Sequence, residues 1–263
     1  MCNRLRWAMA ADPAWLVTAA HALGRHALAL FLALLLLLPA AAGLGGRWLL
    51  RTGARCGNRG GALAAAAGMA IFATLATLLL TGDALRTADQ ALADALRASV
   101  PPGVLPLFAA VTHLAGTATL TALSIILALL MAALRQPALM LGWVLALAGN
   151  GLLNRSLKAL FGRARPPGAD PSWAETGFSF PSGHSSGAVV AYGLLAYTAL
   201  RLLPARWHGA SLVAAVALVW SIGASRVFLG VHFASDVIAG FASGGVWLLL
   251  CIGVLGLAQP TPR

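Results

Sequence analysis

The stretch from Ser225 to Asp236 holds the residue types best suited to chemistry. It reads Ser-Arg-Val-Phe-Leu-Gly-Val-His-Phe-Ala-Ser-Asp and lies between two long apolar runs. If a helix begins near His232, Asp236 falls on the same helix face, four residues later. A carboxylate there can accept a proton from one imidazole nitrogen while the lone pair of the other attacks an electrophile, as in covalent catalysis. Arg226 is then suited to hold an anion, although Arg226 and Asp236 acting only as helix caps is an alternative.

Two earlier clusters also contain residues that bind anions. Lys158, the only lysine in the chain, precedes Arg165 with six residues between them. Its compact ammonium differs chemically from a guanidinium. The tetrapeptide 181–184, Pro-Ser-Gly-His, stands at the start of an apolar run, where a helix N-terminus presents backbone N–H groups and the positive end of its dipole. Gly183 allows a ligand to approach the backbone closely.

The composition indicates a polytopic membrane protein. The chain has 263 residues, of which 60% are hydrophobic and 10% are charged, whereas a soluble domain has about 25% charged residues. The net charge of +11 does not indicate nucleic-acid binding, because most arginines fall in short loops between apolar runs rather than in a polar basic domain. Cys2, Cys56 and Cys251 have no paired spacing, so we predict neither a disulfide framework nor a metal site.

Apolar runs predict six core transmembrane helices, since a membrane span needs roughly 20 such residues. The runs lie at 62–81, 117–134, 139–157, 185–203, 211–224 and 233–255. When these spans alternate in direction, the arginine-bearing loops at 46–61, 135–137 and 201–208 all fall on one side. The positive-inside rule assigns that side to the cytoplasm.

The segments before and between these spans are less regular. Residues 27–45 are apolar but contain Pro39, and a span, an interfacial helix or a signal sequence all fit them; we expect an extra membrane helix. The acids of residues 83–102, which include Asp89, fit the outer side, and the apolar spacing there predicts a short amphipathic helix on the membrane. Residues 104–113 are too short to span. The expected organisation is an extension over 1–61, a membrane domain over 62–256 and a cytoplasmic tail over 257–263.

The predicted topology brings the three clusters to one face. No span separates the first cluster from the second, and two spans separate the second from the third, so all open on the outer side. Their cations, helix start and two histidines suit a tetrahedral dianion. Asn150, Asn154 and Lys158 form a polar stripe on one helix face, for which helix–helix contact and a water-filled cavity are both open interpretations.

The clusters together resemble the three-part signature of the type 2 phosphatidic acid phosphatase family, which includes membrane lipid phosphatases and, more distantly, soluble vanadium haloperoxidases. The matching motifs are Lys158-x6-Arg165-Pro166, Pro181-Ser182-Gly183-His184 and Ser225-Arg226-x5-His232-x3-Asp236. The resemblance covers about residues 62–256 and leaves no signature position unfilled.

The resemblance implies a role for each motif residue. His232 is the expected nucleophile and forms a phosphohistidine, Asp236 orients it, and His184 protonates the leaving oxygen and then activates water. The residues expected to hold the phosphoryl oxygens are Lys158, Arg165, Ser182, Gly183 and Arg226. No metal or other cofactor is expected, because the basic residues supply the positive charge.

The resemblance also implies a fold and an activity. The expected fold is an all-α membrane bundle, and the expected activity is a lipid phosphatase of a bacterial inner membrane whose site faces the periplasm. Undecaprenyl diphosphate, phosphatidylglycerol phosphate and phosphatidate are candidate substrates; membrane lipids are expected partners and nucleic acid is not. A lipid phosphotransferase with the same histidine chemistry, or a non-catalytic lipid-binding or transport protein, are the alternatives.

Overall fold

The computed structural model describes residues 14–52, 58–170, 172–173 and 176–258, and helices are the only regular elements in these ranges. The α-helices are α1 (Ala14–Arg25), α2 (Ala27–Thr52), α3 (Asn58–Thr81), α4 (Ala84–Ser99), α5 (Leu105–Thr112), α6 (Thr117–Ala133), α7 (Pro137–Phe161), α8 (Gly183–Leu202), α9 (His208–Phe228) and α10 (Ala234–Ala258). Three short 3-10 turns, at Pro102–Val104, His113–Ala115 and Ala205–Trp207, join some of them. The all-α class predicted from the sequence is confirmed.

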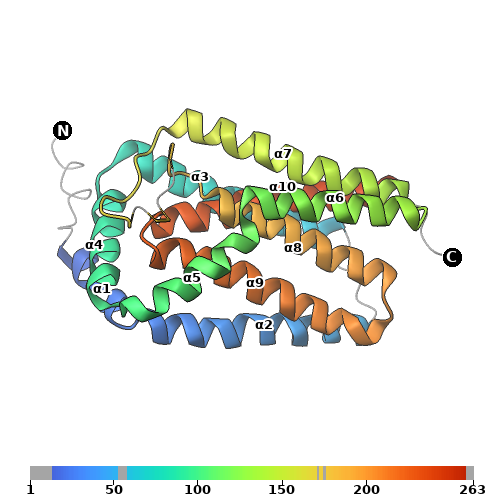
Figure 1. Cartoon of the computed structure of the whole chain (residues 1–263), viewed down its shortest axis with the longest axis horizontal. Coiled ribbons are helices and arrows are strands. Elements are labelled where there is room, and N and C mark those ends of the chain that lie inside the picture. The colour runs from blue at the N-terminus through green and yellow to red at the C-terminus, as the bar shows by residue number, and fades with distance from the viewer. Residues whose placement is uncertain (1–13, 53–57, 171, 174–175, 259–263) are drawn as a thin grey trace, which may run out of the picture.

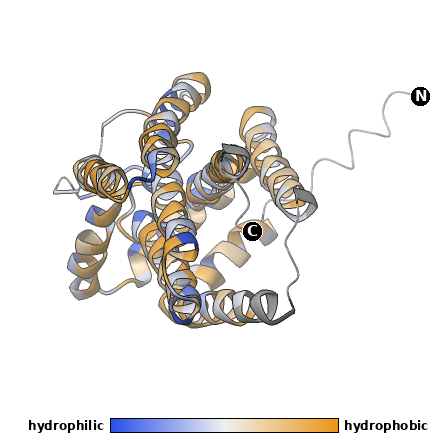
Figure 2. Cartoon of the chain, turned by 90° about the vertical axis from the view of Figure 1, so that its right-hand side faces the viewer, coloured by the Kyte–Doolittle hydropathy of each residue, from blue (hydrophilic) through white to orange (hydrophobic). Residues whose placement is uncertain are grey.

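The long helices run side by side along the long axis of the molecule (Figure 1). Within the described ranges, five stretches are long and apolar enough to cross a membrane: Ala27–Gly46, Gly60–Thr81, Pro137–Phe161, Ala205–Phe228 and Ala234–Gly256. Apolar residues predominate along these helices (Figure 2), and leucines such as Leu36 and Leu63 are 73% and 72% exposed. Such exposure is expected of side chains that face lipid. The chain is therefore a multi-pass membrane protein.

Helix α8 occupies the centre of the bundle. It packs against α7, α9 and α10, and its residues Val190 and Leu194 are fully buried beside Trp143 of α7. Its first turn contains glycine, histidine and serines, which lowers its hydropathy. A helix with these polar groups can lie at membrane depth because other helices surround it.

Two helices at one end run across the long axis. Helices α1 and α4 pack together and cover the end at which α3 and α7 finish and at which α8 and α10 begin (Figure 1). We call this the α4 end of the bundle. Helix α1 was not predicted, because residues 14–25 mix apolar residues with His21 and Arg25 and form no run of membrane length.

The predicted extra membrane helix at 27–45 forms most of α2, which lies along α9 from the α4 end to the opposite end (Figure 1). Contacts between the rings of Phe31, Phe108 and Phe228 join α2 to α5 and α9. The arginines of the basic loop predicted at 46–61 lie outside the described side chains. The division of the chain at residues 61 and 256 remains a prediction.

The segment between α3 and α6 differs from expectation in one respect. Helix α4 is the predicted amphipathic helix, but Asp89, one of the acids interpreted above as fitting the outer side, is buried. The stretch 104–113, predicted as too short to span, forms α5 and packs against α9. Asp89 is buried because it pairs with a cation from another loop, as described below.

Candidate active site

Four helix ends meet at the α4 end of the bundle and carry the three sequence motifs. Lys158 lies in the last turn of α7, Arg226 in the last turn of α9 and Asp236 in the first turn of α10. Gly162 ends α7 with a φ of +57°, and Gly230 turns the chain between α9 and α10 with a φ of +67°. Glycine adopts these positive φ values without steric cost, so both chain reversals can be tight.

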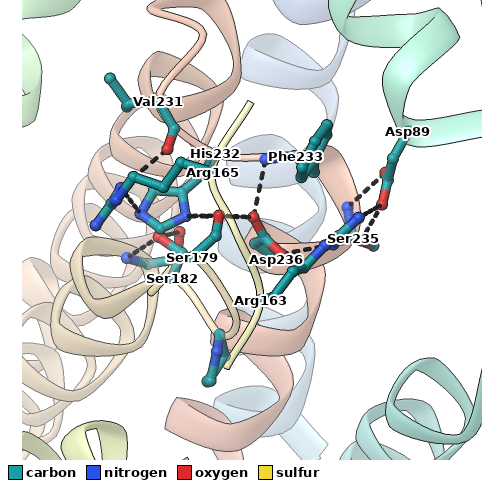
Figure 3. Close-up of polar contacts among 12 residues, drawn as sticks. Asp89, Arg163, Arg165, Ser179, Ser182, Val231, His232, Phe233, Ser235 and Asp236 are labelled. Carbon is teal, nitrogen blue, oxygen red and sulfur yellow. Dashed lines mark hydrogen bonds and ion pairs between the residues drawn. The ribbon is translucent and has the colours of Figure 1, made fainter. Parts of the chain in front are cut away.

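His232 and Asp236 form a buried pair. The Nδ1 atom of His232 lies 3.4 Å from Oδ2 of Asp236 and 3.2 Å from Oγ of Ser179, whose hydroxyl also donates to the same carboxylate oxygen (Figure 3). The backbone N–H of Phe233 donates to that oxygen at 2.9 Å. Asp236 is 0% exposed and His232 is 1% exposed. The carboxylate is thus held from several directions, as an orienting group requires.

Arg165 lies on the other side of the imidazole ring. Its Nη1 atom is 3.1 Å from Nε2 of His232 and donates to the carbonyl of Val231 at 2.9 Å. A guanidinium is always protonated and has no acceptor, so Nε2 must accept this hydrogen bond. The geometry therefore assigns the lone pair to Nε2 and the proton to Nδ1, next to Asp236. This is the tautomer that a nucleophilic Nε2 needs.

Arg163 extends this pair toward α4, and sequence reasoning missed it. Its Nη1 atom lies 2.7 Å from Oδ1 of Asp236 and 2.8 Å from Oγ of Ser235, and its Nη2 atom lies 2.8 Å from Oδ2 of Asp89. A continuous chain of contacts thus runs from His232 to α4 (Figure 3). Arg163 stands among the six unspecified positions of the first motif. Arg163 pairs with Asp89, which lies 74 residues earlier in the chain. A single pair at that separation produces no recognisable spacing in one sequence.

The second motif begins α8 and contacts the third. The Ser182 side chain caps α8 by accepting from the backbone N–H of Ser185 at 3.3 Å, and the N–H of Ser182 donates to the carbonyl of Asp236 at 2.9 Å. Gly183 and His184 follow in the first turn of α8. The first N–H groups of a helix have no partner within the helix and favour an anion. The predicted anion-binding helix start thus lies directly beside the His232–Asp236 pair.

Arg226, in the last turn of α9, is held by contacts of both its side chain and its backbone. It is 1% exposed, and its Nη1 atom donates to Oγ1 of Thr112 in α5 at 2.6 Å. Its carbonyl accepts from the backbone N–H of His232 at 3.2 Å. Arg226 therefore fixes the backbone that carries the imidazole, besides supplying a buried positive charge. The interpretation of Arg226 and Asp236 as helix caps alone does not account for these contacts.

The polar stripe on α7 contacts α8 and the loop before it. The side-chain amides of Asn150 and Asn154 each lie 3.4 Å from Oγ of Ser186, and Asn154 also lies 3.4 Å from the carbonyl of Pro181. The interpretation as helix–helix contact therefore holds for both asparagines. Asn154 in addition supports the loop that leads into the second motif.

Two glycines on α10 allow it to approach the start of α8. A Cβ atom at Gly240 would lie 2.6 Å from the carbonyl oxygen of Ser182, and one at Gly244 would lie 2.7 Å from that of Ser186. Contacts of this length are too short, and the opposing atoms belong to the backbone. The spacing of these glycines matches the small-residue pattern of closely packed membrane helices. The pattern here positions the second motif against the third.

We expect Gly240→Ala to lower the rate of the phosphoryl transfer expected from the three motifs by roughly 10²-fold, because a shift of about 1 Å at Ser182 misplaces the helix start. Overpacking also destabilises by about 1–3 kcal/mol. Gly245→Ala on the same helix is the matched control, since an added Cβ there has nothing within 4 Å. Steady-state rates and melting temperatures of the two variants in detergent provide the measurement. Equal rates in both variants would contradict the close packing.

The protonation state of His232 gives a pH prediction. Burial, the largest cause, lowers the pKa of its imidazole from 6.5 to about 4, and the nearby arginines add to this effect. We therefore expect ¹⁵N NMR of imidazole-labelled protein to show a neutral ring with the proton on Nδ1 from pH 8 to about pH 5. The signal is assigned by its loss in His232→Gln. A ring that titrates near pH 6.5 contradicts this prediction.

The same pKa difference affects stability. Between pH 6.5 and about 4, the unfolded chain binds a proton at His232 that the folded chain does not bind. This position therefore contributes its full stability above pH 6.5 and loses it progressively as the pH falls. The direction is opposite to that of a histidine that gains a proton on folding.

Cations and histidines dominate the site. In the described part of the chain, no group of three or more His, Cys, Asp or Glu side chains could hold a metal ion. The three motif cations, Arg163 and the start of α8 all lie at one end of the bundle. Such an arrangement can stabilise a phosphoryl group by charge and position.

Comparisons with known proteins agree with this chemistry. The family model described as the PAP2 superfamily matches residues 137–258. Phosphatidylglycerophosphatase B of Bacillus subtilis (strain 168) is 35% identical over 194 residues, which cover 73% of this chain and 93% of the relative. Lipid A 1-phosphatase of Rhizobium etli is 40% identical over 110 residues, covering 38% of this chain and 44% of the relative.

A solved structure also matches. It is the crystal structure of a transmembrane PAP2-type phosphatidylglycerolphosphate phosphatase from Bacillus subtilis, with a TM-score of 0.71 and 31% sequence identity. The match covers 75% of this chain and 98% of the other. About a quarter of the present chain thus has no counterpart in that structure.

Proposed function

The chain belongs to the PAP2 superfamily, and on this premise we propose that it is a membrane lipid phosphatase that acts through a phosphohistidine at His232. It removes a terminal phosphate from a lipid phosphate or diphosphate. The single observation that carries the proposal is the geometry of His232, whose Nε2 atom accepts from Arg165 at 3.1 Å while Nδ1 faces Asp236.

In the first half of the reaction, the lone pair of His232 Nε2 forms a bond to phosphorus as the bond from phosphorus to the lipid oxygen breaks. His184 gives its proton to that oxygen. Asp236 and Ser179 stabilise the positive charge that develops on the imidazole, since both contact Nδ1. The incoming phosphoryl group takes over the hydrogen bond that Arg165 makes to Nε2.

In the second half, His184 accepts a proton from water, the water oxygen attacks phosphorus, and the bond between nitrogen and phosphorus breaks. Inorganic phosphate leaves and His232 returns to its starting state. The equatorial oxygens are held by the cations and the start of α8, namely Lys158, Arg165, Ser182, Gly183 and Arg226. Such catalysis depends mostly on positioning and charge.

We further propose a bacterial inner-membrane location with the site on the periplasmic face. In the predicted topology, the basic loops at 46–61, 135–137 and 201–208 share the side opposite the three motifs. The connections from α6 to α7 and from α8 to α9 lie at the end opposite α4 (Figure 1). The positive-inside rule favours that end for the cytoplasm. The candidate site then lies at the headgroup level of the outer leaflet, where a lipid phosphate can reach it.

A phosphate-release panel with purified protein tests the function. We expect phosphate from at least one of phosphatidylglycerol phosphate, phosphatidate, undecaprenyl diphosphate and lipid A 1-phosphate, with the same rate with and without chelator. Loss of activity with chelator contradicts the cationic, metal-independent site. With a lipid labelled in its terminal phosphate, transfer of the label to an added lipid or sugar instead of to inorganic phosphate identifies a phosphotransferase. Absence of phosphate release from all four lipids contradicts the proposal.

A further inference from the structure

The loop that follows α7 is joined to α4 at a second place, beyond the contact between Arg163 and Asp89. Nη2 of Arg97, in the last turn of α4, donates to the carbonyl oxygen of Pro167 at 2.6 Å. The loop descends beside α4 between these contacts (Figure 1). Arg165 lies between the two anchored positions of the loop. Helix α4 thus holds the loop on both sides of Arg165.

The guanidinium of Arg97 is itself oriented by a carboxylate. Its Nη1 atom lies 2.9 Å from Oδ1 of Asp94, which also accepts from Nε2 of Gln90 at 3.0 Å. Two nitrogens of one planar group therefore bond to α4 and to the loop at once, a geometry that a lysine ammonium does not reproduce. Gly168, with a φ of +78°, brings the next turn of the loop against the same group, since a Cβ atom there would lie 3.5 Å from Cζ of Arg97.

The length of the loop leaves it little slack between the two anchors. Asp89 and Arg97 are eight residues apart, which is about 12 Å along a helix. The four-residue step from Arg163 to Pro167 reaches about 13–14 Å when it is fully extended. The last two of these residues are prolines, which fix their own φ and disfavour a helical conformation in the residue before them. A taut and stiff segment transmits a displacement of one anchor to the residues between the anchors.

The direction of the Arg165 guanidinium matters for the proposed chemistry. Its Nε atom donates to the carbonyl of Gly177 at 3.1 Å, and its Nη1 atom donates to the carbonyl of Val231 at 2.9 Å and lies 3.1 Å from Nε2 of His232. In the proposed reaction the same guanidinium passes from Nε2 to the phosphoryl group. A shift of about 1 Å in a group that positions a substrate can cost roughly 10²-fold in rate. The backbone that carries Arg165 therefore has to be fixed.

We infer that Arg97 is a positioning residue, which holds the backbone of the loop so that the guanidinium of Arg165 meets the phosphoryl group. The inference rests on the proposed function and adds a residue on which phosphoryl binding depends. Arg97 lies outside the three motifs and outside residues 137–258, which match the family model. It acts through Arg165 rather than on the substrate.

Arg97→Met is expected to weaken the binding of inorganic phosphate about fivefold, the effect of one lost hydrogen bond, and to lower kcat/KM for the best lipid of the panel by at least as much. The Kd for phosphate is measured by ³¹P NMR titration in detergent, which needs no turnover. The melting temperature is expected to stay close to that of the wild type, because Arg97 and Asp94 are about half exposed. Arg97→Lys keeps a donor for the carbonyl of Pro167 and is expected to recover part of the affinity. Arg155→Met, on the exposed face of α7, is the matched control and is expected to keep the wild-type Kd.

Two further variants distinguish positioning from a general loss of positive charge. Asp94→Asn removes the charge that orients Arg97 and is expected to weaken phosphate binding about twofold, whereas a purely electrostatic effect would strengthen it. In Arg165→Lys protein the guanidinium that Arg97 positions is absent, so adding Arg97→Met is expected to weaken binding by less than about twofold. A further fivefold loss in that background overturns the inference, because Arg97 then acts independently of Arg165. Wild-type phosphate affinity in Arg97→Met overturns it as well.

Failure of the proposed function gives a different result. A wild-type protein that binds inorganic phosphate but releases none from any lipid overturns the proposed function, while the phosphate affinities of the variants still decide the inference. A wild-type protein that binds no inorganic phosphate overturns both. If Arg97→Met does not fold, the direction of the change in Asp94→Asn decides the inference alone.

Discussion

His232→Ala is expected to reduce phosphate release by at least about 10³-fold, to the background of the assay. The substitution removes the atom that is proposed to bond to phosphorus, and loss of a nucleophile is among the most costly changes to a covalent enzyme. The measurement is the initial rate of phosphate release from the best lipid of the panel. The neighbouring cations and the start of α8 remain, so lipid binding is expected to change far less than the rate.

His26→Ala is the control for this prediction, because His26 is exposed between α1 and α2, outside the site. Its rate is expected to equal that of the wild type. A His232→Ala protein that elutes and melts like the wild type but keeps more than a tenth of its rate would show that another group attacks phosphorus.

Arg163→Met is expected to cost about 3–5 kcal/mol of stability and to lower kcat by roughly 10²-fold. The substitution leaves two buried carboxylates without their shared cation, since Arg163 lies 2.7 Å from Asp236 and 2.8 Å from Asp89. Asp236 then no longer holds the imidazole of His232 in place. Thermal unfolding in detergent and steady-state kinetics measure the two effects.

Arg155→Met on the exposed face of α7 is the matched control and is expected to change neither quantity. Adding Asp89→Asn to Arg163→Met removes one of the uncompensated charges, so stability is expected to recover in part while kcat stays low. If Arg163→Met lowers stability but leaves kcat at the wild-type value, the chain of contacts from α4 to His232 has no role in positioning the imidazole of His232.

The sequence was sufficient to predict the membrane bundle and the convergence of the three motifs. Apolar runs of spanning length set the helices, and the alternation of the spans required Lys158, His184 and His232 to share one end. The agreement has a physical basis: backbone groups in lipid must bond within their own helix, so a long apolar run has few alternatives to a spanning helix.

The remainder of the site depends on packing between distant segments. Ser179, Arg163 and Asp89 join the site through single contacts with Asp236 or with one another, without a repeat or a spacing rule. The acids of residues 83–102 looked alike in the sequence, and only packing distinguishes buried Asp89 from exposed Asp94. Helix α1 was missed for a related reason, because its stability comes from contact with α4 rather than from hydropathy.

The central claim is that phosphorus becomes bonded to His232 during turnover. Rapid quenching of the wild-type protein with a lipid labelled in its terminal phosphate, followed by peptide mapping, tests it directly. The account predicts a base-stable, acid-labile label on the peptide that contains His232, and no label in His232→Ala. Phosphate release that proceeds with no labelled protein at any quench time, or a label on a different residue, would contradict it.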